Sequence, residues 1–148
     1  MKIIRLIQVA LLTVVLSITY GQTEIDPTGI YKYKGKTSVV NGQVFGPYSG
    51  TISVKKITDT SIAMSFFICK GAPSFNNGSF EDTLAYHNNL AVYTVPNIDS
   101  SCNITFSFKN KSVIVKETAA VYNSGCGFGH AVVADGNFKK TSSKIIER

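Results

Sequence analysis

Residues 102–117 read CNITFSFKNKSVIVKE, and this stretch predicts a β-hairpin. Apolar residues recur at every second position on each side of a turn at Asn110-Lys111. They are Ile104, Phe106 and Phe108 before the turn, and Val113 and Val115 after it. Pairing Phe108 with Val113 places Phe106 opposite Val115, so one register brings both apolar rows to the same face. The stretch therefore predicts an antiparallel sheet with one buried face.

The rest of the mature chain also consists of short strand-like segments separated by turn residues. No part of it has a convincing 3.6-residue apolar period, and clusters of Gly, Pro and Asn interrupt it at close intervals. The predicted strands are Gly29–Lys34, Tyr48–Ile57, Ser61–Lys70, Gly78–Tyr86, Leu90–Val95, Cys102–Lys109, Ser112–Thr118 and Ala131–Lys140.

These eight strands predict an all-β domain in the form of a single antiparallel up-and-down barrel. An eight-stranded sheet can close on itself and so remove its exposed edges. Closure pairs the first strand with the segment around Asp135–Lys139. A two-sheet β-sandwich is the main alternative fold. An outer-membrane barrel is disfavoured, because several strands are shorter than about 9–11 residues and the chain ends in the charged segment Lys144–Arg148.

The N-terminus has the pattern of a signal peptide. Lys2 and Arg5 precede an apolar run from Leu6 to Ile18, and small residues suit cleavage after Gly21. The run is shorter than the roughly 20 apolar residues that span a bilayer, so we expect no transmembrane segment after its removal. A secreted or periplasmic location is predicted. The predicted regions are a signal peptide (1–21), a leader (22–28), a β-barrel domain (29–140) and a charged C-terminal tail (141–148).

The charge of the mature chain argues against a nucleic-acid partner. Removing 21 of the 148 residues leaves 127, which is enough for one domain with a hydrophobic core. Loss of Lys2 and Arg5 lowers the formal net charge from +6 to +4. The remaining lysines are scattered, and neither a basic helix nor an arginine cluster is present. Nucleic acid is therefore not an expected partner.

An up-and-down path sorts the connections between the two ends of the barrel. Tight turns fall at one end, while longer connections rich in Gly, Asn and aromatic residues fall at the other, which we call the loop-rich end. Binding surfaces usually lie on long loops that a rigid scaffold carries. The predicted connections at this end are 35–47, 71–77, 96–101 and 119–130. The candidate binding residues there are Phe45, Tyr48, Phe75, Tyr122, Ser124, Phe128 and His130.

Three cysteines allow one intramolecular disulfide in an exported chain. The strand path puts Cys69, Cys102 and Cys126 at the loop-rich end, so every pairing is geometrically possible. We predict Cys102–Cys126, because the hairpin register carries Cys102 opposite Ala119 and the following loop can fold back over it. Cys69 is then expected to be a free, buried, small apolar residue.

No group of residues in the sequence has the pattern of a catalytic or metal site. Cys126 and His130 lie four residues apart, but that spacing aligns side chains only in a helix, and the glycines around them predict a loop. A zinc site needs about four ligands, and the second histidine, His87, falls at the opposite end. We therefore predict no catalytic residue, no metal and no cofactor.

The C-terminal third resembles a known class of proteins. The residues that carry the resemblance are Cys102-x-Ile104-x-Phe106-x-Phe108, Val113-x-Val115, Gly125-Cys126-Gly127 and Asp135-Gly136-x-Phe138-Lys139. Over residues 102–140 the chain is similar to small exported bacterial proteins with a calycin-like (lipocalin-like) β-barrel, some of which are likened to lysozyme inhibitors. The resemblance implies a barrel fold.

In some of those inhibitors a Ser-Gly-x-x-Tyr loop carries the inhibition. This chain has Ser124-Gly125 followed by Phe128 in place of the tyrosine, which removes the phenolic hydroxyl. A net charge of +4 also opposes binding to a cationic lysozyme.

From these features we expect an exported, non-enzymatic protein that contacts a macromolecule with its loop-rich end, with an inhibitor-like role as one form of this function. The alternative is a lipocalin-type carrier of a small apolar ligand. The two differ in the barrel interior. A carrier needs a cavity, whereas a binding scaffold is filled by side chains such as Phe66, Phe106 and Phe108.

Overall fold

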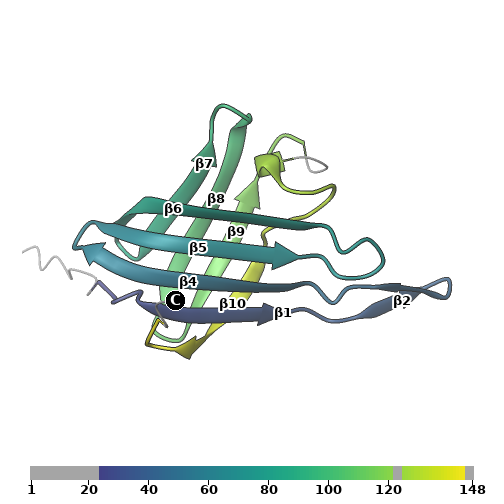
Figure 1. The fold of residues 1–148 in the computed structure, drawn as a ribbon, viewed down its shortest axis with the longest axis horizontal. Coiled ribbons are helices and arrows are strands. Elements are labelled where there is room, and N and C mark those ends of the chain that lie inside the picture. Colours follow the sequence, from purple (N-terminus) through teal and green to yellow (C-terminus); the bar gives the residue numbers. More distant parts are fainter. Residues whose placement is uncertain (1–23, 122–124, 146–148) are drawn as a thin grey trace, which may run out of the picture.

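Eight strands form one closed, antiparallel up-and-down barrel in the computed structural model, which describes residues 24–121 and 125–145 (Figure 1). Each strand pairs with the next one along the barrel, and the last pairs with the first. The barrel strands are β1 (Gly29–Lys34), β4 (Ser49–Thr58), β5 (Ser61–Cys69), β6 (Asn77–His87), β7 (Leu90–Val95), β8 (Asp99–Lys109), β9 (Ser112–Thr118) and β10 (Gly136–Ser142). A separate hairpin, β2 (Ser38–Val40) and β3 (Gln43–Phe45), interrupts the connection from β1 to β4. The predicted fold class is confirmed.

The hairpin of β8 and β9 has the predicted register. Phe108 lies opposite Val113, and Phe106 lies opposite Val115. These four side chains are buried, whereas Thr105, between Phe106 and Ile104, faces outward. The two-residue alternation in the sequence therefore identified the buried face of the sheet.

Aromatic side chains fill the interior of the barrel. The rings of Phe66 and Phe106 meet edge to face, with their centroids 5.7 Å apart and an interplanar angle of 74°. Phe108 contacts the rings of Tyr31 and Tyr86 in the same manner. Edge-to-face pairs at such separations are favourable. The centre of the barrel is therefore occupied by side chains.

The last strand differs from the prediction. The expected strand Ala131–Lys140 is wrong at its start, because β10 begins at Gly136 and extends to Ser142. Before Gly136, two side chains make hydrogen bonds in place of the backbone pairing between strands. The Glu117 N–H donates to Asp135 Oδ1 at 2.8 Å, and the Ala134 N–H donates to Glu117 Oε2 at 2.7 Å. The connection from β9 to β10 is therefore longer than the sequence suggested.

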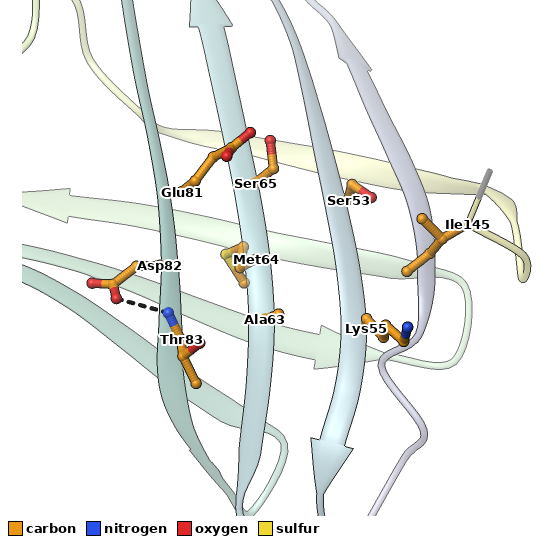
Figure 2. Close-up of a pocket in the computed structure, with 9 residues that line it drawn as sticks. All are labelled: Ser53, Lys55, Ala63, Met64, Ser65, Glu81, Asp82, Thr83 and Ile145. Carbon is orange, nitrogen blue, oxygen red and sulfur yellow. Dashed lines mark hydrogen bonds between the residues drawn. The ribbon is translucent and has the colours of Figure 1, made fainter. Parts of the chain in front are cut away.

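Side chains hold much of the seam between β6 and β7. The two strands pair only next to their connecting turn and diverge beyond it (Figure 1). The rings of Phe80 and Tyr93 bridge the seam, stacked in parallel with their centroids 3.7 Å apart. Asp82 is exposed and accepts a hydrogen bond from the Thr83 N–H at 2.7 Å (Figure 2). A charge at a strand edge hinders pairing with another chain.

The described part of the predicted leader packs across the tight-turn end. The Ile25 N–H donates to Asn89 Oδ1 at 2.7 Å, and the Tyr86 hydroxyl donates to the Ile25 carbonyl at 2.6 Å. The Tyr31 hydroxyl donates to the Pro27 carbonyl at 2.7 Å. Asn89 and both tyrosines are buried. This segment therefore covers the tight-turn end and belongs to the fold.

Candidate functional site

The longer connections gather at the loop-rich end, as the up-and-down path predicts. They link β1 to β4, β5 to β6, β7 to β8 and β9 to β10, and the last contains a short 3₁₀ turn, η1 (Gly125–Gly127). The first connection contains the hairpin of β2 and β3, which extends away from the barrel (Figure 1). We call this hairpin, residues 38–45, the finger.

The finger exposes four large apolar side chains. Val39 is 66% exposed, Val40 55%, Val44 45% and Phe45 40%. Val39 lies directly opposite Val44, and Ser38 lies opposite Phe45. Because neighbouring residues of a strand face opposite sides, Val39 and Val44 occupy one face, while Val40 and Phe45 occupy the other. Both faces of the finger are therefore apolar.

The base of the finger is fixed to the neighbouring loop. The Gly46 N–H donates to the Ala72 carbonyl at 2.9 Å, which forms an isolated antiparallel bridge. Gly71 packs closely there, since a Cβ on it would lie 2.5 Å from the Pro47 carbonyl oxygen. Its φ of +71° is also one that glycine adopts readily. The finger therefore projects from an anchored base.

The predicted binding residues that the structure describes fall into an exposed group and a group with internal contacts. Phe45, Phe75 and His130 are exposed at the loop-rich end, and Phe75 is 63% exposed. Tyr122 and Ser124 lie outside the described residues.

Phe128 and Tyr48 have internal contacts. Phe128 is buried, and its ring stacks with Phe66 at a centroid distance of 6.1 Å. Tyr48 is half-buried, and its hydroxyl donates to the Ala131 carbonyl at 3.0 Å. Both side chains therefore hold the loop-rich end together, and Phe45, Phe75 and His130 are the described members of the predicted set that remain available.

The disulfide Cys102–Cys126 is confirmed. The two Cα atoms are 5.2 Å apart, and the bridge closes a separation of 24 residues. A loop of that length stabilises the fold by on the order of 3 kcal/mol in the chain-entropy model. Because its sulfur is bonded to Cys102, Cys126 has no thiol to serve as a nucleophile or a metal ligand.

Cys69 is the free cysteine, as predicted, but it is only half-buried. It faces outward on β5, as does Phe67. Its Sγ lies 3.6 Å from the Phe75 carbonyl oxygen and accepts a hydrogen bond from the Gly71 N–H at 3.4 Å. The expectation of a buried apolar cysteine is therefore wrong, because the residue falls on the outer face of the strand.

Glu117 is a carboxyl buried beside the disulfide loop. It is 8% exposed, and among the described residues its Oε1 atom has no hydrogen-bond partner. Burial raises the pKa of Glu117, and the nearby carboxylates of Asp135 and Asp99 raise it further. The hydrogen bond from the Ala134 N–H opposes these effects. The ionised form of Glu117 is therefore disfavoured in the folded protein.

We expect Glu117→Gln to change how stability depends on pH. The folded pKa is raised, so the folded state holds its proton more tightly than the unfolded chain. Wild-type stability should be greatest below the unfolded pKa and should fall as pH rises through the folded pKa. The variant has no titratable group at this position, so it should not show this fall and should be more stable than the wild type in alkaline solution. Urea unfolding from pH 4 to pH 8 measures the difference. Glu81→Gln, at an exposed site on β6, is the control, and parallel wild-type and Glu117→Gln profiles would contradict the assignment.

A shallow pocket of about 500 Å³ lies on the outer wall of β4, β5 and β6. Figure 2 shows Glu81 and Asp82 on one side of it, with Lys55 and Ile145 on the other. Ser53, Ala63, Met64 and Ser65 lie between them. Because charges of both signs border this pocket, it does not define one class of ligand.

Comparison of the chain with protein-family models, curated proteins and solved structures finds no match. Within residues 24–121 and 125–145, no three or more His, Cys, Asp or Glu side chains are grouped so that they could hold a metal ion. No helix in these same ranges is long and apolar enough to cross a membrane. The geometry of the loop-rich end is therefore the basis for a functional proposal.

The finger is the feature of this surface that the sequence prediction missed. Residues 35–47 were expected to be a loop. The signal was nevertheless present, because Asn41-Gly42 separates Val39-Val40 from Val44-Phe45. An Asn-Gly pair between apolar residues is a strong hairpin pattern. The strand pattern on either side of this pair is weak, because each strand of the finger has only three residues.

Proposed function

We propose that this protein is an exported, non-enzymatic binding protein whose loop-rich end contacts another protein. The observation that carries the proposal is the finger, with apolar side chains exposed on both of its faces. Exposed apolar groups that lie together are characteristic of interaction sites. A disulfide within the barrel supports export, because such bonds persist in oxidising compartments.

The two-faced pattern indicates how the finger would be used. A hairpin with one apolar face can bury it by lying flat on a partner. Burial of Val39 and Val44 together with Val40 and Phe45 requires contact from both sides, which a cleft in the partner provides. The exposed ring of Phe75 adds apolar surface at the same end. This arrangement also fits an inhibitor-like role.

The barrel interior offers less support for a small-ligand carrier. The positions that a ligand would occupy are filled by Phe66, Phe106 and Phe108, each at most 1% exposed. The pocket beside Glu81 and a second pocket beside Lys139 both lie on the outer wall. A macromolecular partner is therefore the function that the geometry favours.

We expect the double substitution Val39→Ser and Val44→Ser to reduce partner binding at least tenfold, because two apolar side chains that the partner would bury are replaced by polar ones. Stability should change by less than about 0.5 kcal/mol, since both side chains are exposed. The measurement is quantitative capture from the native extracellular or periplasmic fluid, with mass spectrometry of the proteins retained.

Val92→Ser is the matched control, because Val92 on β7 is 45% exposed, as is Val44. A photoreactive residue at position 45 should crosslink to the protein that is captured, and one at position 92 should not. Undiminished capture by the double variant would remove the finger from the binding surface.

A further inference from the structure

Three lysines border one side of a hollow on the outer wall, where β1 leads toward the finger. Lys32 and Lys34 lie on β1, two residues apart and therefore on the same face. Lys139 on β10 lies directly opposite Lys32. The hollow that they border has a volume of about 530 Å³. All three side chains are exposed.

These lysines form a concentration of unbalanced positive charge. Two lysines elsewhere have acidic partners, Lys56 with Asp59 and Lys116 with Asp135. Among the described residues, no ion pair involves any of the three lysines at the hollow. Like charges directly opposite each other on neighbouring strands destabilise a sheet. The pairing of Lys32 with Lys139 therefore carries a cost that an anionic partner would remove.

The remaining walls of the hollow are neutral. Ser49 and Thr51 contribute hydroxyl groups from β4, and Phe67 on β5 is 43% exposed. Among residues 24–121 and 125–145, no carboxylate lines the hollow, and the sequence contains no Asp or Glu between Thr28 and Thr58. The hollow therefore combines cationic, hydroxyl and apolar groups without a competing negative charge.

We propose that this hollow binds an acidic polypeptide segment of the partner. The inference rests on the proposed function. It specifies the chemistry of the partner's surface next to the cleft that would receive the finger. Lys34 at the end of β1 is four residues before the finger begins at Ser38, so one protein can contact both features. The exposed Phe67 ring suits the apolar side chains of a polypeptide. An anionic membrane fits less well, because the tip of the finger is the polar pair Asn41-Gly42.

The test uses a fluorescein-labelled peptide of eight glutamates with a central leucine. Fluorescence anisotropy at low salt should show that Lys32→Ala, Lys34→Ala and Lys139→Ala together weaken peptide binding at least tenfold. The control is Lys109→Ala, Lys111→Ala and Lys144→Ala, which removes the same charge from exposed sites near the tight-turn end. The control should weaken peptide binding less than twofold. Peptide binding should also depend less on salt concentration in the Lys32/Lys34/Lys139 variant than in the control. Thermal unfolding checks that both variants are folded.

Equal weakening by the two variants would overturn the proposal, because net charge alone would then explain the binding. The proposal would also be overturned if heparin, or vesicles containing phosphatidylglycerol, bound through the same three lysines more tightly than the glutamate peptide does. Failure of the two proposals can be told apart. If the first lysine variant still captures the partner while Val39→Ser/Val44→Ser does not, the lysine site is wrong and the finger stands. If the Val39→Ser/Val44→Ser variant captures the partner normally, the finger proposal is wrong, whatever the result of the peptide-binding measurement.

Discussion

Replacement of Phe106 by alanine should lower the free energy of unfolding by about 3–5 kcal/mol. Phe106 is fully buried, and its ring meets those of Phe66 and Phe80 at centroid distances of 5.7 and 6.0 Å. Truncation removes these contacts and leaves a cavity that close-packed neighbours fill only in part. Because whole domains have a stability of about 5–15 kcal/mol, the loss should be evident in a urea titration.

Thr105→Ala is the matched control for this change. Thr105 is the preceding residue on β8 but faces outward, opposite Val92 on one side and Lys116 on the other. Its replacement should alter stability by about 0.5 kcal/mol or less. Similar losses from the two substitutions would contradict the assignment of inner and outer faces.

The second large effect is expected from Phe128→Ala, which should cost about 3 kcal/mol. Phe128 lies in the connection between β9 and β10, yet its ring reaches the core and stacks with Phe66. The ring lies so close to Gly78 that a Cβ there would overlap it. Loss of the ring therefore removes the contact that seals the barrel at this end. Thermal or urea unfolding measures the cost.

Phe75→Ala makes the same chemical change at an exposed site of the loop-rich end. It should leave stability within about 0.5 kcal/mol of the wild type and should weaken partner capture. A loss of stability as large as that of Phe128→Ala would show that the exposed and buried aromatic residues of this end have been wrongly distinguished.

Local alternation and topology were sufficient to predict much of the fold. The register of Phe106 with Val115 follows from two-residue periodicity, and the closed barrel follows from the number of strands and their short turns. The disulfide was predicted because the register of β8 and β9 places Cys102 near the loop that contains Cys126. Each of these inferences depends on neighbours along the chain or across one strand pair.

The features that were missed depend on contacts between distant parts of the chain. Phe128 has no strand pattern around it, so its burial follows only from the space beside Gly78. The leader was expected to precede the domain, but the partner of the Ile25 N–H is Asn89, 64 residues away. The strand ending at Lys140 was misplaced because the Asp135 and Glu117 side chains take over hydrogen bonds that a ladder would otherwise make.

The pairing of β1 with β10 has a consequence for the order of folding. Ile30 lies opposite Ser142, so the barrel closes between residues more than a hundred positions apart. Such non-local pairing makes folding slow, because the chain must lose loop entropy before the contact forms. Until residues 136–142 have paired, both β1 and β9 remain open edges that other copies of the chain can join. Arrival of the last strand covers both edges in a single step.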